Sequence, residues 1–132
     1  MKYTLLTLLV LAALIVAFGA GCEENPAASY KPYVVNTNDS FHFQVKDFKN
    51  HDTTTVYYWH MLGSAANIDQ SAEFKGGSVS VTIADSALQQ VYVTDLKATG
   101  SYTTLSGTPG WWRISIVMKG FSGSIDFWAL RK

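Results

Sequence analysis

The 132-residue sequence has a single cysteine, Cys22, and no excess of charge of either sign. One sulfur excludes a disulfide within the chain, so the fold must be stabilised by its hydrophobic core. Ten lysine and arginine residues balance ten aspartate and glutamate residues, which leaves no basic field to attract a polyanion. We therefore expect no nucleic-acid partner.

Catalytic signatures are also absent. The sequence contains no G-x-S-x-G, H-E-x-x-H or C-x-x-C motif, and no glycine-rich loop joining a strand to a helix. Acidic residues stand mostly in turn-like stretches, as Asp39, Asp52, Asp85 and Asp95 do, where aspartate is favoured for its local hydrogen bonds. We predict that the protein is not an enzyme and needs no cofactor.

What the sequence does have is a long apolar run at its start. Residues 4 to 18 are apolar or small apart from two threonines, Lys2 precedes them, and the small residues 19 to 21 lead to Cys22. This is the build of a secretory signal peptide with its cleavage site. The stretch "AFGAGC" resembles the lipobox of bacterial lipoproteins, although the position three before Cys22, usually aliphatic in that family, is Gly19.

The resemblance implies that Cys22 carries a diacylglyceryl group, that the signal is cut just before it, and that fatty acids such as palmitate anchor the chain. Two or more acyl chains give stable attachment to a membrane. The alternatives are an uncleaved transmembrane anchor, since about twenty apolar residues can span a bilayer, and plain secretion. We expect a signal peptide over residues 1–21, a lipidated cysteine with a tether over 22–36, and a domain over 37–132. The location would be the cell envelope, on the outer side of the cytoplasmic membrane or in the outer membrane.

From Phe41 onward the hydrophobic residues recur with a period of two. "FHFQVKDF", "TTTVYYWHML", "SVSVTIADS", "QVYVTDL", "SYTTL", "WWRISIVMK" and "SIDFWALRK" are separated by turn-like stretches. Seven or eight short strands predict an antiparallel β-sandwich, immunoglobulin-like or jelly-roll-like, with a small barrel as the alternative. Residues 76–132 resemble the sandwiches of small bacterial lipoproteins and surface proteins, a likeness that implies fold and not activity.

The stretch "GFSG" predicts a hairpin that pairs Met118 with Ile125 and Ile116 with Phe127. Arg113 and Trp128 then point outward, and Trp111 stands at the start of that strand. Exposed aromatic side chains beside polar groups suit a sugar ring or the apolar surface of a partner. We predict a binding surface formed by Trp128, Trp111, Arg113 and Tyr58.

The stretch "KNHD" predicts a second hairpin, which places His42 opposite His60 on the outer face. Two histidines are fewer than the three or four ligands of a zinc site, so no metal site is predicted and a metal-scavenging role rests on these two alone. The "VNTNDS" stretch offers Asn36, Asn38 and Asp39 as oxygen ligands for calcium, without the spacing of an EF-hand.

Together these features predict a lipid-anchored, non-catalytic binding or adhesion module whose ligand is a glycan or an envelope protein. The alternative, from a different class, is a structural subunit of an envelope or surface assembly that pairs through an open strand edge.

Overall fold

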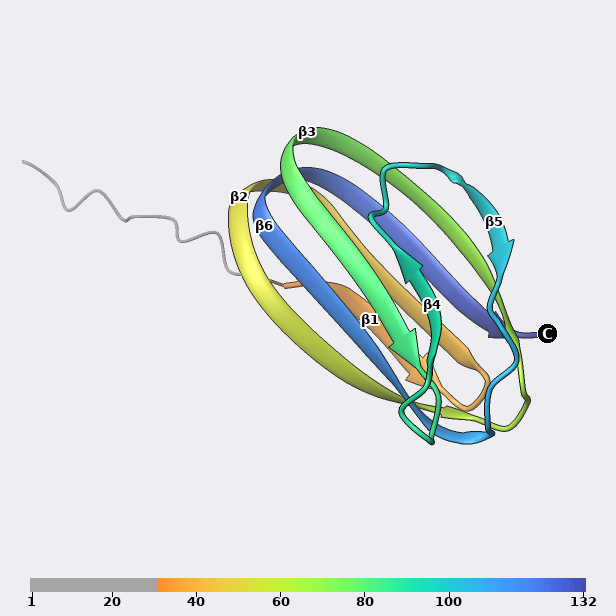
Figure 1. Ribbon diagram of the computed structural model, residues 1–132. Coiled ribbons are helices and arrows are strands. Elements are labelled where there is room, and N and C mark those ends of the chain that lie inside the picture. The colour runs from red at the N-terminus through yellow and green to blue at the C-terminus, as the bar shows by residue number, and fades with distance from the viewer. Residues whose placement is uncertain (1–30) are drawn as a thin grey trace, which may run out of the picture.

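The computed structural model describes residues 31–132 (Figure 1). The expected signal peptide, Cys22 and the first residues of the tether lie outside the described residues. The described part is all-β and antiparallel, with no helix. Its six strands are β1 (Tyr33–Thr37), β2 (Ser40–Met61), β3 (Ala66–Ala84), β4 (Gln90–Thr94), β5 (Gly100–Thr103) and β6 (Gly110–Arg131). No helix in this part of the chain is long and apolar enough to cross a membrane.

Three long strands form the body of the sheet. β6 lies in the middle, with β2 on one side and β3 on the other; β1 extends the sheet beyond β2, while β4 and β5 both pair with β3. The pairing of β6 with β2 runs from Met61 opposite Gly110 to Ser40 opposite Leu130. Its pairing with β3 is equally long.

All three long strands bend at the same level, and the sheet folds back over itself (Figure 1). The ladder is irregular between Val45 and Thr53 of β2 and between Phe74 and Ser78 of β3. At the bend, Gly77 and Gly123 have φ angles of 74° and 139°, which residues other than glycine rarely adopt. A Cβ on Gly77 would lie 2.2 Å from the oxygen of Gly120, and one on Gly123 would lie 1.8 Å from the oxygen of Glu73.

The bend divides one sheet into two layers. Layer 1 consists of β1, residues 40–45 of β2, 125–131 of β6, 66–74 of β3, and β5. Layer 2 consists of residues 53–61 of β2, 110–118 of β6, 78–84 of β3, and β4. The ring centroids of Phe41 in layer 1 and Tyr57 in layer 2 are 5.3 Å apart although both residues belong to β2, so the layers pack face to face.

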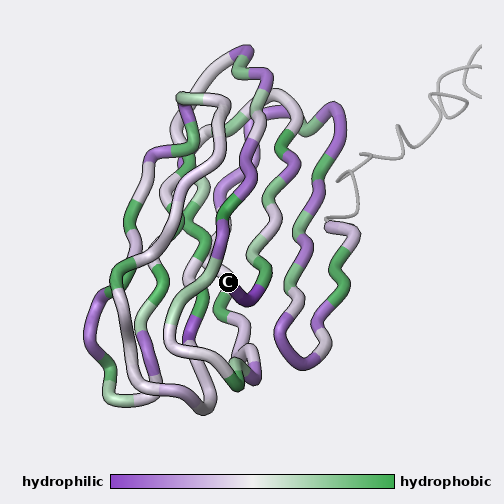
Figure 2. The backbone as a smooth tube through the Cα atoms, turned by 90° about the vertical axis from the view of Figure 1, so that its right-hand side faces the viewer, coloured by the Kyte–Doolittle hydropathy of each residue, from purple (hydrophilic) through white to green (hydrophobic). Residues whose placement is uncertain are grey.

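The core lies between these layers. Hydropathy alternates along the strands, as Figure 2 shows, and the inward positions are almost fully buried. Trp59 and Trp112 meet edge to face at 5.9 Å, and their indole N–H groups donate to the backbone oxygens of Thr37 and Thr108. The inward apolar side chains of β2, β3 and β6 are buried, as the period of two in the sequence predicts: Phe41, Phe43, Val45, Trp59, Met61, Val79, Val81, Ile83, Trp112, Ile114, Ile116, Met118, Ile125, Phe127 and Ala129.

Two predicted hairpins are wrong. Residues 41–61 and 112–131, each expected to form two strands joined by a turn, are single strands that pair with each other on both sides of the bend. Glycine and positive φ angles serve a sharp bend as well as a hairpin turn, so "KNHD" and "GFSG" do not distinguish the two. The count is therefore six strands, fewer than expected. The first strand, β1, starts at Tyr33, within the stretch expected to be the tether.

Asp85 organises the loop between β3 and β4. Its side chain is buried, and its carboxylate accepts hydrogen bonds from the backbone N–H groups of Ala87, Gln89 and Thr108. The bond from Thr108 is the main cause that lowers the pKa of Asp85 below its ordinary value, against the opposing effect of burial.

Because the pKa of Asp85 is lowered on folding, ionised Asp85 stabilises the fold above the pKa of the unfolded chain. This contribution is lost as the pH falls from about 4 through the lowered pKa of the folded state. We expect Asp85→Asn to unfold at lower urea concentration than the wild type at pH 7. The difference should shrink as the pH is lowered below about 4; a difference that stays constant with pH would contradict this role.

Candidate functional site

The outer face of layer 1 carries a compact aromatic and polar cluster. His42 of β2 stands directly opposite Trp128 of β6, and their rings stack with centroids 3.7 Å apart and planes 10° apart. Tyr33 of β1 meets the His42 ring edge to face at 5.5 Å. The imidazole is thus enclosed, with 8% of its side chain exposed, and it supports one face of the Trp128 indole.

Asp126 holds this cluster in place. It lies two residues before Trp128 on β6, opposite Gln44 of β2. His42 Nε2 donates to Asp126 Oδ1 at 2.6 Å, and Gln44 Nε2 donates to Asp126 Oδ2 at 3.3 Å. The Asp126 side chain is still 40% exposed. A carboxylate can accept about four hydrogen bonds, so Asp126 holds its two neighbours and keeps acceptor capacity for a ligand.

Trp128 lines a hollow of about 300 Å³ beside β5. Asp69 is opposite Trp128 in β3, and Ser101 of β5 donates a short hydrogen bond to the Asp69 carboxylate. The hollow contains no basic side chain; its lining residues are Asp69, Gln70, Ser71, Thr99, Gly100, Ser101, Asp126 and Trp128.

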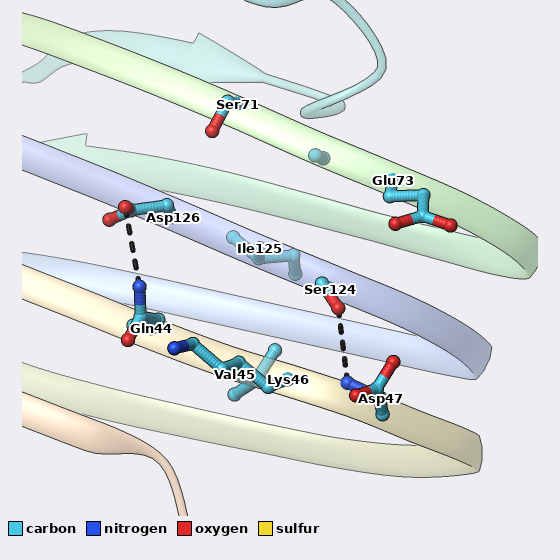
Figure 3. A pocket seen from close by; sticks show the side chains of 10 residues that line it. Gln44, Val45, Lys46, Asp47, Ser71, Glu73, Ser124, Ile125 and Asp126 are labelled. Carbon is cyan, nitrogen blue, oxygen red and sulfur yellow. Dashed lines mark hydrogen bonds between the residues drawn. The ribbon is translucent and has the colours of Figure 1, made fainter.

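A second hollow, of about 510 Å³, continues toward the bend (Figure 3). It shares Ser71 and Asp126 with the first hollow, so the two form one groove across the outer face of layer 1, which we call the Trp128 groove. Figure 3 shows Gln44 bonded to Asp126, and Ser124 accepting from the backbone of Asp47. The lining residues of this second hollow are Gln44, Val45, Lys46, Asp47, Ser71, Ala72, Glu73, Ser124, Ile125 and Asp126.

Carboxylates dominate the charge of the Trp128 groove. Asp47, Asp69, Glu73 and Asp126 line it, against Lys46 as its basic member. The nearby Lys75 approaches Asp47 and Glu73 at 3.9 and 3.8 Å, but all three side chains are well exposed, so these ion pairs are weak. The groove therefore presents acceptors and a negative potential.

The four predicted binding residues do not form one surface. Trp128 lies in the groove on layer 1, whereas Trp111, Arg113 and Tyr58 lie on the outer face of layer 2, where Tyr58 pairs with Arg113. Trp111 and Tyr58 are 63% and 62% exposed. All four point outward as predicted, but the bend sends the two halves of β6 to opposite sides of the molecule.

The predicted juxtaposition of His42 with His60 is wrong for the same reason. His42 pairs with Trp128 in layer 1, and His60 pairs with Trp111 in layer 2. Within residues 31–132 no group of three histidine, cysteine or acidic side chains could hold a metal ion.

The three oxygen donors considered for calcium have structural partners instead. Asn36 donates to the oxygen of Tyr58, and Asn38 Oδ1 lies 3.1 Å from His60 Nδ1. Asp39 accepts from the N–H of Leu62 and forms a 3.0 Å ion pair with Arg131. These contacts tie the turn between β1 and β2 to layer 2 and to the end of the chain.

Several residues of the site were not predicted. Gln44, Asp69, Ser71 and Asp126 line the groove, and His42 and Tyr33 support Trp128 by ring contacts. Strand alternation already places Asp126 and Trp128 on one face of β6, and His42 and Gln44 on one face of β2. The missing step was the pairing of those two strand halves with each other.

If the His42 ring positions Trp128 by stacking, the two side chains should be energetically coupled. We expect the double-mutant cycle of His42→Ala and Trp128→Ala to give a coupling free energy of about 0.5–1.5 kcal/mol in urea unfolding. The matched control is the pair His60 and Trp111 of layer 2, whose ring planes are tilted by 37° with centroids 4.8 Å apart. Equal coupling in both cycles, or none in the first, would contradict a special role for the stack.

Comparisons with known proteins identify no family. No family model matches the chain, and no curated protein matches it. Among solved structures, TmCBM61 in complex with β-1,4-galactotriose is similar at 12% identity and a TM-score of 0.40, over 76% of this chain and 69% of that one. A structure of accessory secretory protein 1, 2 and 3 from Streptococcus pneumoniae has 12% identity and a TM-score of 0.35, over 79% and 88%. The infectious bursal disease virus Gt strain has 9% identity and a TM-score of 0.30, over 76% and 32%. At these scores the likenesses carry no information on ligands.

Proposed function

We propose that the protein is a non-catalytic glycan-binding module, held at the cell envelope by its lipidated N-terminal region, that takes a sugar chain in the Trp128 groove. The observation that carries the proposal is the stacked Trp128, set among hydrogen-bonding side chains in a groove. An indole face packs against the C–H face of a pyranose ring, while polar groups at its rim bind the hydroxyls. His42 covers one face of the indole, so the ligand uses the side that lines the hollow.

The polar groups suit hydroxyls. A sugar hydroxyl both donates and accepts, and the groove offers carboxylate acceptors in Asp69 and Asp126 and mixed groups in Gln44 and Ser71. Each hollow is as large as a small-molecule pocket, of the order of 300–1,000 Å³. Because the two hollows adjoin at Ser71 and Asp126, the groove offers room for more than one ring of an oligosaccharide.

The charges select the kind of sugar. A uronic acid or sulfated sugar would bring a negative charge against Asp69 and Asp126, which no arginine or lysine in the Trp128 hollow compensates. Neutral sugars avoid this repulsion. The proposed ligand class is therefore a neutral glycan.

The geometry around His42 supports a binding role over a catalytic one. A general base must reach the proton that it removes. His42 is enclosed by Tyr33, Trp128 and Asp126, and its Nε2 is used in the bond to Asp126. In this arrangement the imidazole positions the indole and the carboxylate.

The test is binding to an array of neutral and acidic oligosaccharides, peptidoglycan fragments included, with each tryptophan variant beside the wild type. We expect neutral glycans to be retained and Trp128→Ala to lose at least about tenfold in affinity, corresponding to 1.4 kcal/mol or more. Trp111→Ala, a change at the outward-pointing tryptophan of the other layer, should bind as the wild type does.

Retention of the glycan by Trp128→Ala, or its loss in Trp111→Ala alone, would contradict the assignment of the groove. If no glycan is retained, the alternative function, a structural subunit of an envelope assembly, is favoured. For that role the sheet has edge strands at β1 and β4.

A further inference from the structure

The outer face of layer 2 differs from that of layer 1 in its charge. Residues 53–61, 78–84, 90–94 and 110–118, which make up layer 2, include no aspartate or glutamate, and their one permanently charged residue is Arg113. Arg113 is exposed and makes no ion pair with any residue of 31–132. The neighbouring Asp85 is buried and bonded to backbone N–H groups. The face thus presents an uncompensated positive charge.

The same face exposes large apolar side chains. Trp111 lies two residues from Arg113 on β6, and Tyr58 stands opposite Arg113 on β2. Leu62 follows at the end of β2 with 52% of its surface exposed, and Val93 of β4 is 58% exposed. Surface apolar residues are ordinary singly, but aromatic and aliphatic side chains gathered around a free cation mark an interaction surface.

We propose that this surface, formed by Tyr58, Leu62, Val93, Trp111 and Arg113, rests on an anionic phospholipid bilayer. Tryptophan and tyrosine are enriched at the headgroup level because their rings are apolar at one end and polar at the other. Arginine is attracted to anionic headgroups, and the strands of layer 2 bring no carboxylate against them. The Asp39 carboxylate next to Leu62 is paired with Arg131.

The short chain before the described residues is the reason to propose a bilayer as the partner of this surface. From Cys22 to Tyr33 an extended chain spans at most about 40 Å, so a lipid on Cys22 or an uncleaved apolar run would keep the domain beside the membrane. At that distance the effective concentration of lipid is high, and a contact that is weak by itself becomes populated.

The orientation has a consequence for the groove. With layer 2 on the bilayer, layer 1 points away from it, since the layers are the two sides of one sandwich (Figure 1). The surface does not require that the groove bind a glycan, and the two proposals can fail separately.

The test uses the full chain reconstituted into vesicles made of equal parts phosphatidylglycerol and phosphatidylcholine, the latter with brominated acyl chains. Bromine quenches nearby indoles, and the four tryptophans of the chain are Trp59, Trp111, Trp112 and Trp128. Because Trp59 and Trp112 are buried, the fluorescence distinguishes the two outer faces.

We expect quenching in the wild type and in Trp128→Phe, and its loss in Trp111→Phe. Arg113→Glu keeps the Trp111 indole but reverses the charge, so it should also lose the quenching, while Arg113→Lys should retain it. If brominated lipid does not quench the wild type, the proposal is overturned, and a second copy of the chain or another protein becomes the candidate for covering this face. Quenching that persists in Trp111→Phe or is unchanged by Arg113→Glu would also overturn the proposal.

Discussion

The close approach of the strands at the bend is the constraint on which the rest of the structure depends. Three long strands turn over together, and they do so where glycine leaves room: a Cβ on Gly77 or Gly123 would overlap the backbone of the neighbouring strand. Without the turn, the apolar face of this sheet would have nothing to pack against. With it, one sheet supplies both layers of the core, and Phe41 packs against Tyr57 of the same strand.

The bend also separates residues that a strand would otherwise keep on one face. Trp111 and Trp128 both point outward from β6, yet they lie on opposite sides of the molecule because the strand reverses between them. The two outer faces can therefore differ in chemistry. One carries a groove with carboxylates around a supported indole. The other carries exposed aromatic residues around Arg113, which forms no ion pair within residues 31–132. A small domain thereby has two outer faces of different chemistry.

Much of the core could be predicted from the sequence. Alternation with a period of two identified the inward residues of β2, β3 and β6 correctly, because burial on one face requires that pattern whatever the strand pairing is. The pairing itself could not be predicted. A stretch such as "GFSG" permits a hairpin or a bend, since both need backbone conformations that glycine adopts readily, and the choice depends on contacts between distant segments.

The site was predicted in part for the same reason. Trp128 was identified from its outward position, but His42, which supports it, belongs to a strand half far away in the sequence. The wrong hairpin placed His42 beside His60 instead. Asp69 and Ser71 reach the groove through β3, whose pairing with β6 no local pattern encodes.

The most direct test of this account is the set of nuclear Overhauser contacts between backbone protons across the strands. Directly opposed residues of antiparallel strands have Cα atoms about 4.5–5.5 Å apart, so their backbone protons are close enough for an Overhauser contact. The folded-over sheet predicts contacts of His42 with Trp128 and of His60 with Trp111, and none between His42 and His60. A contact between the two histidines would show that residues 41–61 form a hairpin, which would contradict the bend and the assignment of both faces.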